Sequence, residues 1–268
     1  MIIYLIFGFV AFVFSVHVFH FLTLSRLIEY KEVSFRSTKI TKNLNGCKIA
    51  IITDVHDVKE EKLREIVNKL NLLNIDLMVL GGDFSENPDI ASSSIRILSE
   101  TQTKSGIFGV DGNHDDHLNL FSAMKANGIT PLSNNGLYAR ENLYVAGVED
   151  YWNRKPNIEQ AIAAAKHNDF KFLIAHNPDV TMVQDTTEID LIVCGHTHGG
   201  QVTLFGVWAP HFTFAKNITK HGQRFLKGWC KSRNGTPVYV SNGVAAGTTG
   251  VPRVFARPQV VILTLLSA

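Results

Sequence analysis

Cysteine is scarce in this chain, with three among 268 residues. Cys47, Cys194 and Cys230 are odd in number, and no two of them have the C-x-x-C spacing. A disulfide framework needs paired cysteines, and small secreted domains that depend on one are far richer in them. The sequence therefore favours a reducing compartment and a fold stabilised by its core, which a hydrophobic content of 45% can supply.

An excess of charge of one sign is also absent. Lys and Arg number 26 against 24 Asp and Glu, which gives a formal net charge of +2. Proteins that bind nucleic acid usually carry a concentrated basic surface, and this balance gives no sign of one. We therefore expect no nucleic-acid partner.

One long uncharged run begins the chain. Residues Ile2 to Leu24 are almost wholly apolar, and about 20 such residues suffice for a helix to cross a bilayer. No Lys or Arg precedes the run and no Ala-x-Ala site follows it, so an uncleaved anchor over residues 1–24 is favoured over a secretory signal. A half-inserted amphipathic helix is the alternative.

The charges after this run predict the orientation of the chain. The positive-inside rule applies to basic residues close to a membrane span, and five follow this one: Arg26, Lys31, Arg36, Lys39 and Lys42. We therefore expect a single-pass protein of the inner (cytoplasmic) membrane, with the rest of the chain facing the cytoplasm.

Apolar periodicity divides the remaining chain. Residues 25–46 are polar and irregular and are predicted to be a linker with an early strand. Helices are expected over 60–74, 92–101, 118–127 and 158–166, and strands over 47–53, 75–80, 107–110, 143–148, 170–175, 191–194, 238–241 and 260–265. Because strands dominate the second half, residues 47–268 are predicted to form an α/β domain, a two-sheet β-sandwich flanked by helices.

Five polar clusters each follow a strand-like run. They are Asp54-Val55-His56, Gly82-Asp83, Gly112-Asn113-His114-Asp115, Ala175-His176-Asn177 and Gly195-His196-Thr197-His198-Gly199-Gly200-Gln201. Loops at the carboxyl ends of strands commonly carry function. Mixed His, Asp and Asn ligands suit two divalent ions such as Mn, Fe, Zn or Ni, without deciding among them.

These motifs as a set resemble the calcineurin-like metallophosphoesterase superfamily over about residues 48–266. The Gly195–Gln201 motif, Ala175-His-Asn-Pro-Asp179 and Val251-Pro-Arg-Val-Phe-Ala-Arg-Pro258 are similar to the bacterial YaeI/YkuE/LpxG-like branch. The resemblance implies a dinuclear metal-dependent phosphoric ester or diphosphate hydrolase. It also implies the ligands: Asp54, His56 and His198 for the first metal, Asn113, His176 and His196 for the second, and Asp83 as the bridge.

The resemblance gives His114 a separate role, as a general acid or electrostatic clamp that faces the phosphate without ligating. Superfamily members often read Gly-Asp-x-x-Asp-Arg after the second strand, whereas this chain has Glu86 and Asn87 at the last two positions. Glu86 is therefore the candidate to orient His114. Arg253 and Asp150 are further candidates, for substrate binding.

The substrate is less specified than the chemistry. Aromatic and basic residues interleave between Val202 and Lys231, a pattern that fits either a lipid-docking surface or an irregular core segment. The first hypothesis is a phosphodiesterase acting on a lipid-linked diphosphate such as UDP-2,3-diacylglucosamine, a lipid A precursor. The alternatives are a general phosphodiesterase with a soluble substrate and a non-catalytic membrane-tethered scaffold, which the complete ligand set disfavours.

Overall fold

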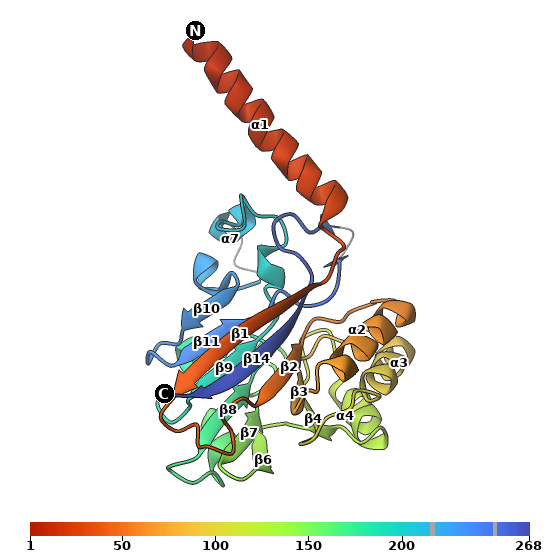
Figure 1. Ribbon diagram of the computed structural model, residues 1–268, viewed down its shortest axis with the longest axis vertical. Helices are drawn as coiled ribbons and strands as arrows, with labels where there is room; N and C mark the ends of the chain where they lie inside the picture. Colours follow the sequence, from red (N-terminus) through yellow and green to blue (C-terminus); the bar gives the residue numbers. More distant parts are fainter. Residues whose placement is uncertain (215–217, 249–250) are drawn as a thin grey trace.

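The computed structural model describes residues 1–214, 218–248 and 251–268. A long N-terminal helix, α1 (Ile2–Thr23), projects away from a domain built of two sheets and several helices (Figure 1). The helix is long and apolar enough to cross a membrane, and none of its most apolar stretch is buried by the rest of the protein. By length and composition it matches the predicted anchor.

Two six-stranded mixed sheets form the domain. The first has the order β1-β14-β2-β3-β4-β5, and the second β10-β11-β9-β8-β7-β6. The strands of the first are β1 (Glu29–Ser37), β14 (Gln259–Ser267), β2 (Lys48–Ile52), β3 (Leu77–Leu80), β4 (Ile107–Gly109) and β5 (Thr130–Pro131). Those of the second are β10 (Gly228–Lys231), β11 (Pro237–Val240), β9 (Leu191–Cys194), β8 (Phe170–Ile174), β7 (Leu143–Gly147) and β6 (Asn135–Arg140).

The alternation of side chains along each strand explains the layers. In β2, Ile49 and Ile51 face the second sheet, whereas Ala50 and Ile52 face the helices. In β9, Leu191 and Val193 join the core between the sheets, and Ile192 packs on the outer face. Strands buried on both faces need apolar residues at every position, which is why these runs are continuous in the sequence. The predicted two-sheet sandwich flanked by helices is confirmed.

Three helices cover the outer face of the first sheet (Figure 1): α2 (Glu60–Leu72), α3 (Pro88–Leu98) and α4 (His117–Ala126). In α2 the buried residues Leu63, Ile66, Val67 and Leu70 follow the helical repeat that predicted it. Asn87 caps α3 through the backbone N–H groups of Asp89 and Ile90. The residue at the position of the family's usual basic side chain therefore starts a helix here.

The shorter elements lie over the second sheet and around the site. They are α5 (Ile158–Ile162), α6 (Val180–Val183), α7 (Pro210–Phe214), the 3₁₀ turns His198–Gly200 and Gly222–Phe225, and a small hairpin of β12 (Gly247–Thr248) and β13 (Val251–Pro252). Strand β1 lies within the segment 25–46 that was predicted as a linker with an early strand. It pairs in parallel with β14 over its whole length, so this segment supplies an edge of the first sheet. The division at residue 47 remains a prediction.

Strand direction brings the polar clusters together. Strands β2, β3 and β4 run parallel in the first sheet, and β8, β9 and β11 run parallel in the second. Their carboxyl ends therefore lie at one edge of each sheet, and the loops that follow them meet across the sandwich. All five motif clusters lie in these loops.

Candidate dinuclear metal centre

Two groups of side chains converge where these loops meet. Asp54, His56, Asp83 and His198 offer ligand atoms that all lie within 4.8 Å of one another, and so do Asp83, His176 and His196. Asp83 belongs to both groups, as a bridging ligand must. Asn113 adjoins the second group, since its Oδ1 lies 3.2 Å from Nε2 of His176. The structure thus brings together all seven residues predicted as ligands.

Unpaired polar atoms inside the cluster fit metal ions. Oδ2 of Asp54 is buried and has no hydrogen-bond partner, and Nε2 of His56 faces Nε2 of His198 at 3.2 Å. Ring nitrogens and carboxylate oxygens directed at a shared point match the donor set of Mn, Fe, Zn or Ni. These residues could therefore hold two divalent ions.

The hydrogen bonds behind two histidines direct one nitrogen of each ring inward. Nδ1 of His176 lies 2.7 Å from the carbonyl of Gly81, and Nε2 of His196 lies 2.7 Å from the carbonyl of Ile218. A carbonyl only accepts, so each of these nitrogens carries the proton and the other nitrogen is left for a metal.

Burial and neighbouring charge set the protonation of the cluster. Burial, assisted by the charge of Arg253, lowers the pKa of His198 to about 3. Burial alone would raise the pKa of Asp83, but the charges of His176 and His56 lower it. Burial alone would lower the pKa of His176, but Asp83 raises it well above its ordinary value. The metal-free site thus has an ionised Asp83 and a neutral His198, both competent as ligands, whereas His176 must release the proton on Nε2 before that nitrogen binds a metal.

The backbone is strained at the ligands. Asp54, His56, Asp83, His196 and His198 all have positive φ, between 44° and 70°. Residues other than glycine rarely adopt this region, and such strain concentrates at functional sites. Gly195 lies between the loops with no side chain, because a Cβ there would collide with the Asp54 carboxylate.

His114 stands beside the cluster and is partly exposed. Its Nδ1 lies 2.7 Å from Oε1 of Glu86, the contact that the sequence proposed, and its ring lies 5.4 Å from that of His56. Both His114 and Glu86 line a cavity of about 980 Å³. Because Glu86 holds Nδ1, Nε2 is the atom available to a phosphoester in this cavity.

The cavity extends from the ligands to the foot of α1. Its polar end includes Asp83, Asn113 and His198, and its other walls include Arg26 and Ile28, which follow α1 closely in the chain. Trp152, Ile218, Val244 and Ala245 add apolar surface, and Lys59 and Lys62 add positive charge. A phosphate and an apolar group can therefore share one cavity.

Arg253, which was predicted to bind substrate, is not among the residues that line this cavity. Its side chain is fully buried. The guanidinium donates to the backbone carbonyl of His198 at 2.8 Å and lies 3.0 Å from Nδ1 of the His198 imidazole. Arg253 therefore positions His198 from behind.

Asp150 is likewise absent from the cavity wall. It is buried, and its Oδ2 accepts from the backbone N–H groups of Trp152 and Asn153 at 2.8 and 2.9 Å. It shapes the loop that places Trp152 against the ring of His196, 4.8 Å away. The neighbouring Trp152, rather than Asp150, faces the cavity.

Asp115 is a residue whose role the sequence did not reveal. Its carboxylate accepts from the backbone N–H groups of Asp83, Phe84 and Gly112 at 2.8, 2.7 and 2.9 Å. It therefore ties the loop after β3 to the loop after β4. The signal available in the sequence was its place directly after Asn113 and His114, in the same motif.

Comparison with known proteins agrees with this geometry. Residues 47–200 match the model of the calcineurin-like phosphoesterase family. An uncharacterized metallophosphoesterase of Helicobacter pylori (strain J99) is 29% identical over 88% of this chain and 63% of its own length. The uncharacterized metallophosphoesterase YkuE of Bacillus subtilis is 28% identical over 90% and 86%. A transmembrane protein with metallophosphoesterase domain from Danio rerio is 26% identical over 88% and 57%.

This chain thus spans 63% of the first of these relatives, and the shared region includes every cluster described above. The matched family segment covers more than half of the chain, and it contains all the candidate ligands and His114. The chain belongs to the calcineurin-like phosphoesterase family.

Proposed function

We propose that this protein is a membrane-anchored, metal-dependent phosphodiesterase that hydrolyses a lipid-linked diphosphate such as UDP-2,3-diacylglucosamine. The observation that carries this proposal is the cavity that joins the candidate metal ligands to Arg26 and Ile28 at the foot of α1. A substrate with a diphosphate and acyl chains matches those two ends. The transmembrane relative from Danio rerio supports a membrane setting for such a domain.

The ligands named above would hold two divalent ions, which would supply Lewis-acid activation of water and of the phosphoryl group. In the hydrolysis, an oxygen from water bonds to one phosphorus of the diphosphate and the bridging P–O bond breaks. The products are UMP and the acylated sugar phosphate. His114, oriented by Glu86, is placed to donate a proton from Nε2 to the departing oxygen.

Lys59, Lys62 and Arg26 give the cavity three positive charges against the negative charge of a diphosphate. Apolar walls at Ile28, Val244 and Ala245 exclude water from the lipid portion. The protein proposed here would act at the cytoplasmic face of the inner membrane, where the basic residues after α1 would hold it.

A panel of phosphoesters tests the proposal with the full-length, metal-loaded protein in lipid vesicles. The panel contains UDP-2,3-diacylglucosamine, the unacylated UDP-N-acetylglucosamine, bis-p-nitrophenyl phosphate and p-nitrophenyl phosphate. The diacylated substrate is expected to give the highest kcat/KM, with UMP as product. A higher value for the soluble diester would instead support the general phosphodiesterase, and no turnover with both metals bound would support the scaffold.

A further inference from the structure

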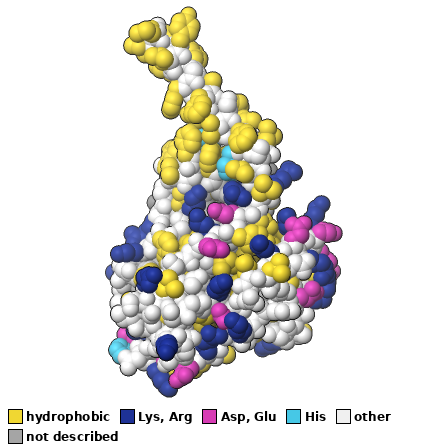
Figure 2. All heavy atoms as spheres, in the orientation of Figure 1, with side chains coloured by type: hydrophobic (Ala, Val, Ile, Leu, Met, Phe, Trp, Pro, Cys, Tyr) yellow, Lys and Arg dark blue, Asp and Glu magenta, His cyan; other side chains and the backbone are white. Residues whose placement is uncertain are grey.

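A cluster of exposed apolar side chains lies on the segment 202–214, beside the foot of α1. Val207 is 74% exposed and Phe214 83%, and Val202, Leu204, Phe205 and Trp208 are exposed as well. Figure 2 shows hydrophobic surface that continues from α1 onto the adjoining end of the domain. Segment 202–214 includes α7, which Figure 1 places at this end. A solvated surface would not ordinarily concentrate such residues.

The segment has a defined shape beneath these side chains. Ala209 and Phe212 are buried with Leu226 in a small core of their own. The backbone of Leu204 bonds to that of Trp208, and the indole N–H of Trp208 donates to Thr213. The apolar side chains are therefore held outward while the segment's other residues fix its base.

Ring contacts join the same segment to α1. Phe205 lies 4.9 Å from the ring of His17, and Phe255 lies 4.8 Å from His17 and 4.3 Å from His20. The backbone N–H of Phe255 donates to Nδ1 of His20 at 3.2 Å. The rings of Phe205 and Phe255 are themselves 5.6 Å apart. Segment 202–214 therefore packs against the C-terminal part of α1.

These contacts set the depth of the segment relative to the helix. His17 precedes the last residue of α1, Thr23, by six positions, which is about 9 Å along the axis at 1.5 Å per residue. The 22 residues of α1 have a length of about 33 Å, close to the roughly 30 Å of a hydrocarbon core. When α1 spans, Phe205 must therefore lie at or just inside the membrane interface.

We propose that the segment 202–214 inserts its apolar side chains into the leaflet that α1 leaves, as a second membrane contact. The proposal rests on the membrane anchoring that is part of the proposed function. Trp favours the interface between headgroups and acyl chains, and interfacial segments bury roughly 5–10 Å into that region. Arg26, exposed at the foot of α1, adds a charge that anionic headgroups would attract.

This second contact would fix how the domain is oriented. A single helix leaves the domain able to tilt and rotate above the bilayer, whereas two contacts set the direction in which the cavity opens. Gln201, which adjoins the segment, lines the cavity, and so do Arg26 and Ile28. The cavity would then open at the level of the lipid headgroups.

Depth-dependent fluorescence quenching tests the insertion directly in the full-length protein. Val207→Cys is labelled with the fluorophore NBD and reconstituted in phosphatidylethanolamine and phosphatidylglycerol vesicles that contain lipids with nitroxide-labelled acyl chains. Cys47 and Cys194 are buried and Cys230 is partly buried, and the unsubstituted protein measures their background labelling. Quenching of the Val207→Cys label is the expected result.

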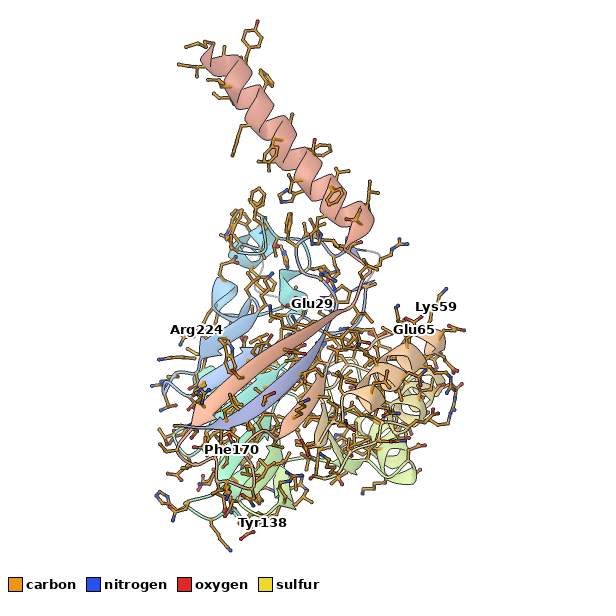
Figure 3. The ribbon with its side chains drawn as sticks, in the orientation of Figure 1. Glu29, Lys59, Glu65, Tyr138, Phe170 and Arg224 are labelled. Carbon is orange, nitrogen blue, oxygen red and sulfur yellow. The ribbon has the colours of Figure 1, made fainter. Side chains whose placement is uncertain are left out.

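His167→Cys is the matched control. The side chain of His167 is 83% exposed, and it follows Lys166, whose backbone bonds to Tyr138, at the end of the domain opposite α1 (Figure 3). Its label should stay unquenched. No quenching at position 207, or equal quenching at both positions, would overturn the proposal. A disulfide between copies of the unlabelled Val207→Cys variant under a mild oxidant, together with no quenching of the labelled one, would overturn it too, in favour of a second copy of this chain as the partner.

A charge substitution gives a second measurement. Val207→Asp should lower turnover of a bilayer-embedded phosphoester while leaving turnover of bis-p-nitrophenyl phosphate unchanged. Leu118→Asp, at a 76% exposed position on α4, should change neither. Quenching does not depend on the substrate, so a wrong substrate would leave the quenching result intact, whereas quenching that fails would leave the proposed hydrolysis open to its own panel.

Discussion

His114 and the candidate ligands differ in what they contact, although all line one site. His114 bonds Glu86 at Nδ1 and is partly exposed, and it belongs to neither group of converging ligand atoms. His114→Ala should therefore lower kcat by about 10²–10⁴, the range for a positioned acid or base, while metal content stays unchanged. Metal analysis alongside steady-state kinetics checks this.

Glu86→Gln is the companion variant, because it removes the charge that orients His114 but keeps the imidazole. We expect a smaller loss of kcat than for His114→Ala. Loss of a metal ion from His114→Ala would show that His114 is a ligand and that the proton-donor role is wrong.

Asp83 is the residue on which both metal positions depend. Its carboxylate lies 3.1 Å from His176 and 3.8 Å from His56, one from each ligand group. Asp83→Ala should therefore reduce metal content below two ions per chain and be the most damaging single ligand change. Chelation of the wild-type protein should abolish hydrolysis of a chromogenic phosphodiester, and full activity of Asp83→Ala with unchanged metal would end the dinuclear interpretation.

Asp76 stabilises the fold away from the site. It accepts from the backbone N–H of Lys48 and from Nζ of Lys104, both at 2.9 Å, and lies 3.5 Å from Arg140. Burial alone would raise its pKa, but these partners lower it. Because the pKa of Asp76 is lower in the folded state than in the unfolded state, where it is near 3.9, the ionised carboxyl stabilises the fold at pH values above the unfolded pKa. This contribution is lost as the pH falls through the folded pKa.

Asp76→Asn should therefore lower the free energy of unfolding by about 1–3 kcal/mol at pH 7, and the difference from wild type should shrink as the pH approaches 3. Denaturant unfolding at several pH values measures both. Glu61→Gln, at an exposed position on α2, should show no such dependence. If the loss in the free energy of unfolding of Asp76→Asn stayed constant with pH, the carboxylate charge would not be its cause.

At the scale of elements, Asp115 joins two loops that must keep their relative position. Its bonds to the backbone of Asp83, Phe84 and Gly112 cross from the end of β3 to the end of β4. Asp115→Ala should therefore weaken metal binding, because the ligands on these loops lose their alignment. Isothermal titration of the metal-free protein with Mn²⁺ or Zn²⁺ measures the change.

The neighbouring Asp116 provides a matched control, since it caps α4 through the backbone N–H groups of Leu118 and Asn119. Asp116→Ala should cost about 1 kcal/mol of stability and leave metal affinity unchanged. Equal metal affinity in the two variants would mean that Asp115 has only a structural role.

The sequence predicted those elements whose residues are buried on both faces. Strand β9 begins and ends where its apolar run does, at Leu191 and Cys194. The edge strand β6 (Asn135–Arg140) was not predicted, because it begins with Asn135 and Gly136 and its burial does not alternate, with Leu137 and Tyr138 both exposed. Helix α5 ends at Ile162 rather than continuing to residue 166. There the backbone of Lys166 bonds instead to Tyr138 and Asp169, a tertiary contact that overrides local helix propensity.

The sequence predicted the part of the candidate site that directly follows the buried strands. Ligands that directly follow strands can be placed once the strands are parallel, because all carboxyl ends then lie at one edge. The direction of a side chain within a long loop is not encoded locally. Arg253 and Asp150 were therefore placed on the substrate side, whereas the structure turns both into the protein. The positive φ of the ligand residues also has no sequence signal, since none of them is glycine.

At the scale of the whole molecule, α1 contributes no candidate metal ligand, although it contacts the domain that holds them. Every candidate ligand lies from Asp54 onward, whereas α1 contacts the domain through His17 and His20. Removing residues 1–24 should therefore release most of the protein from membranes, leaving only the contact proposed for segment 202–214, and should spare activity on a small soluble phosphodiester. It should weaken activity on a bilayer-embedded lipid, because the anchor raises the local concentration of enzyme at that surface.

Orientation is tested on the same full-length chain. A reporter fused after Ala268 should behave as cytoplasmic, since basic residues closely follow α1. The truncation experiment needs the soluble diester as its internal reference, because loss of activity on it would indicate misfolding of the shortened protein. A periplasmic reporter signal, or equal retention of activity on both substrates after truncation, would count against a cytoplasmic lipid precursor. Either result would favour a general phosphodiesterase whose anchor localises the protein without presenting it to a lipid substrate.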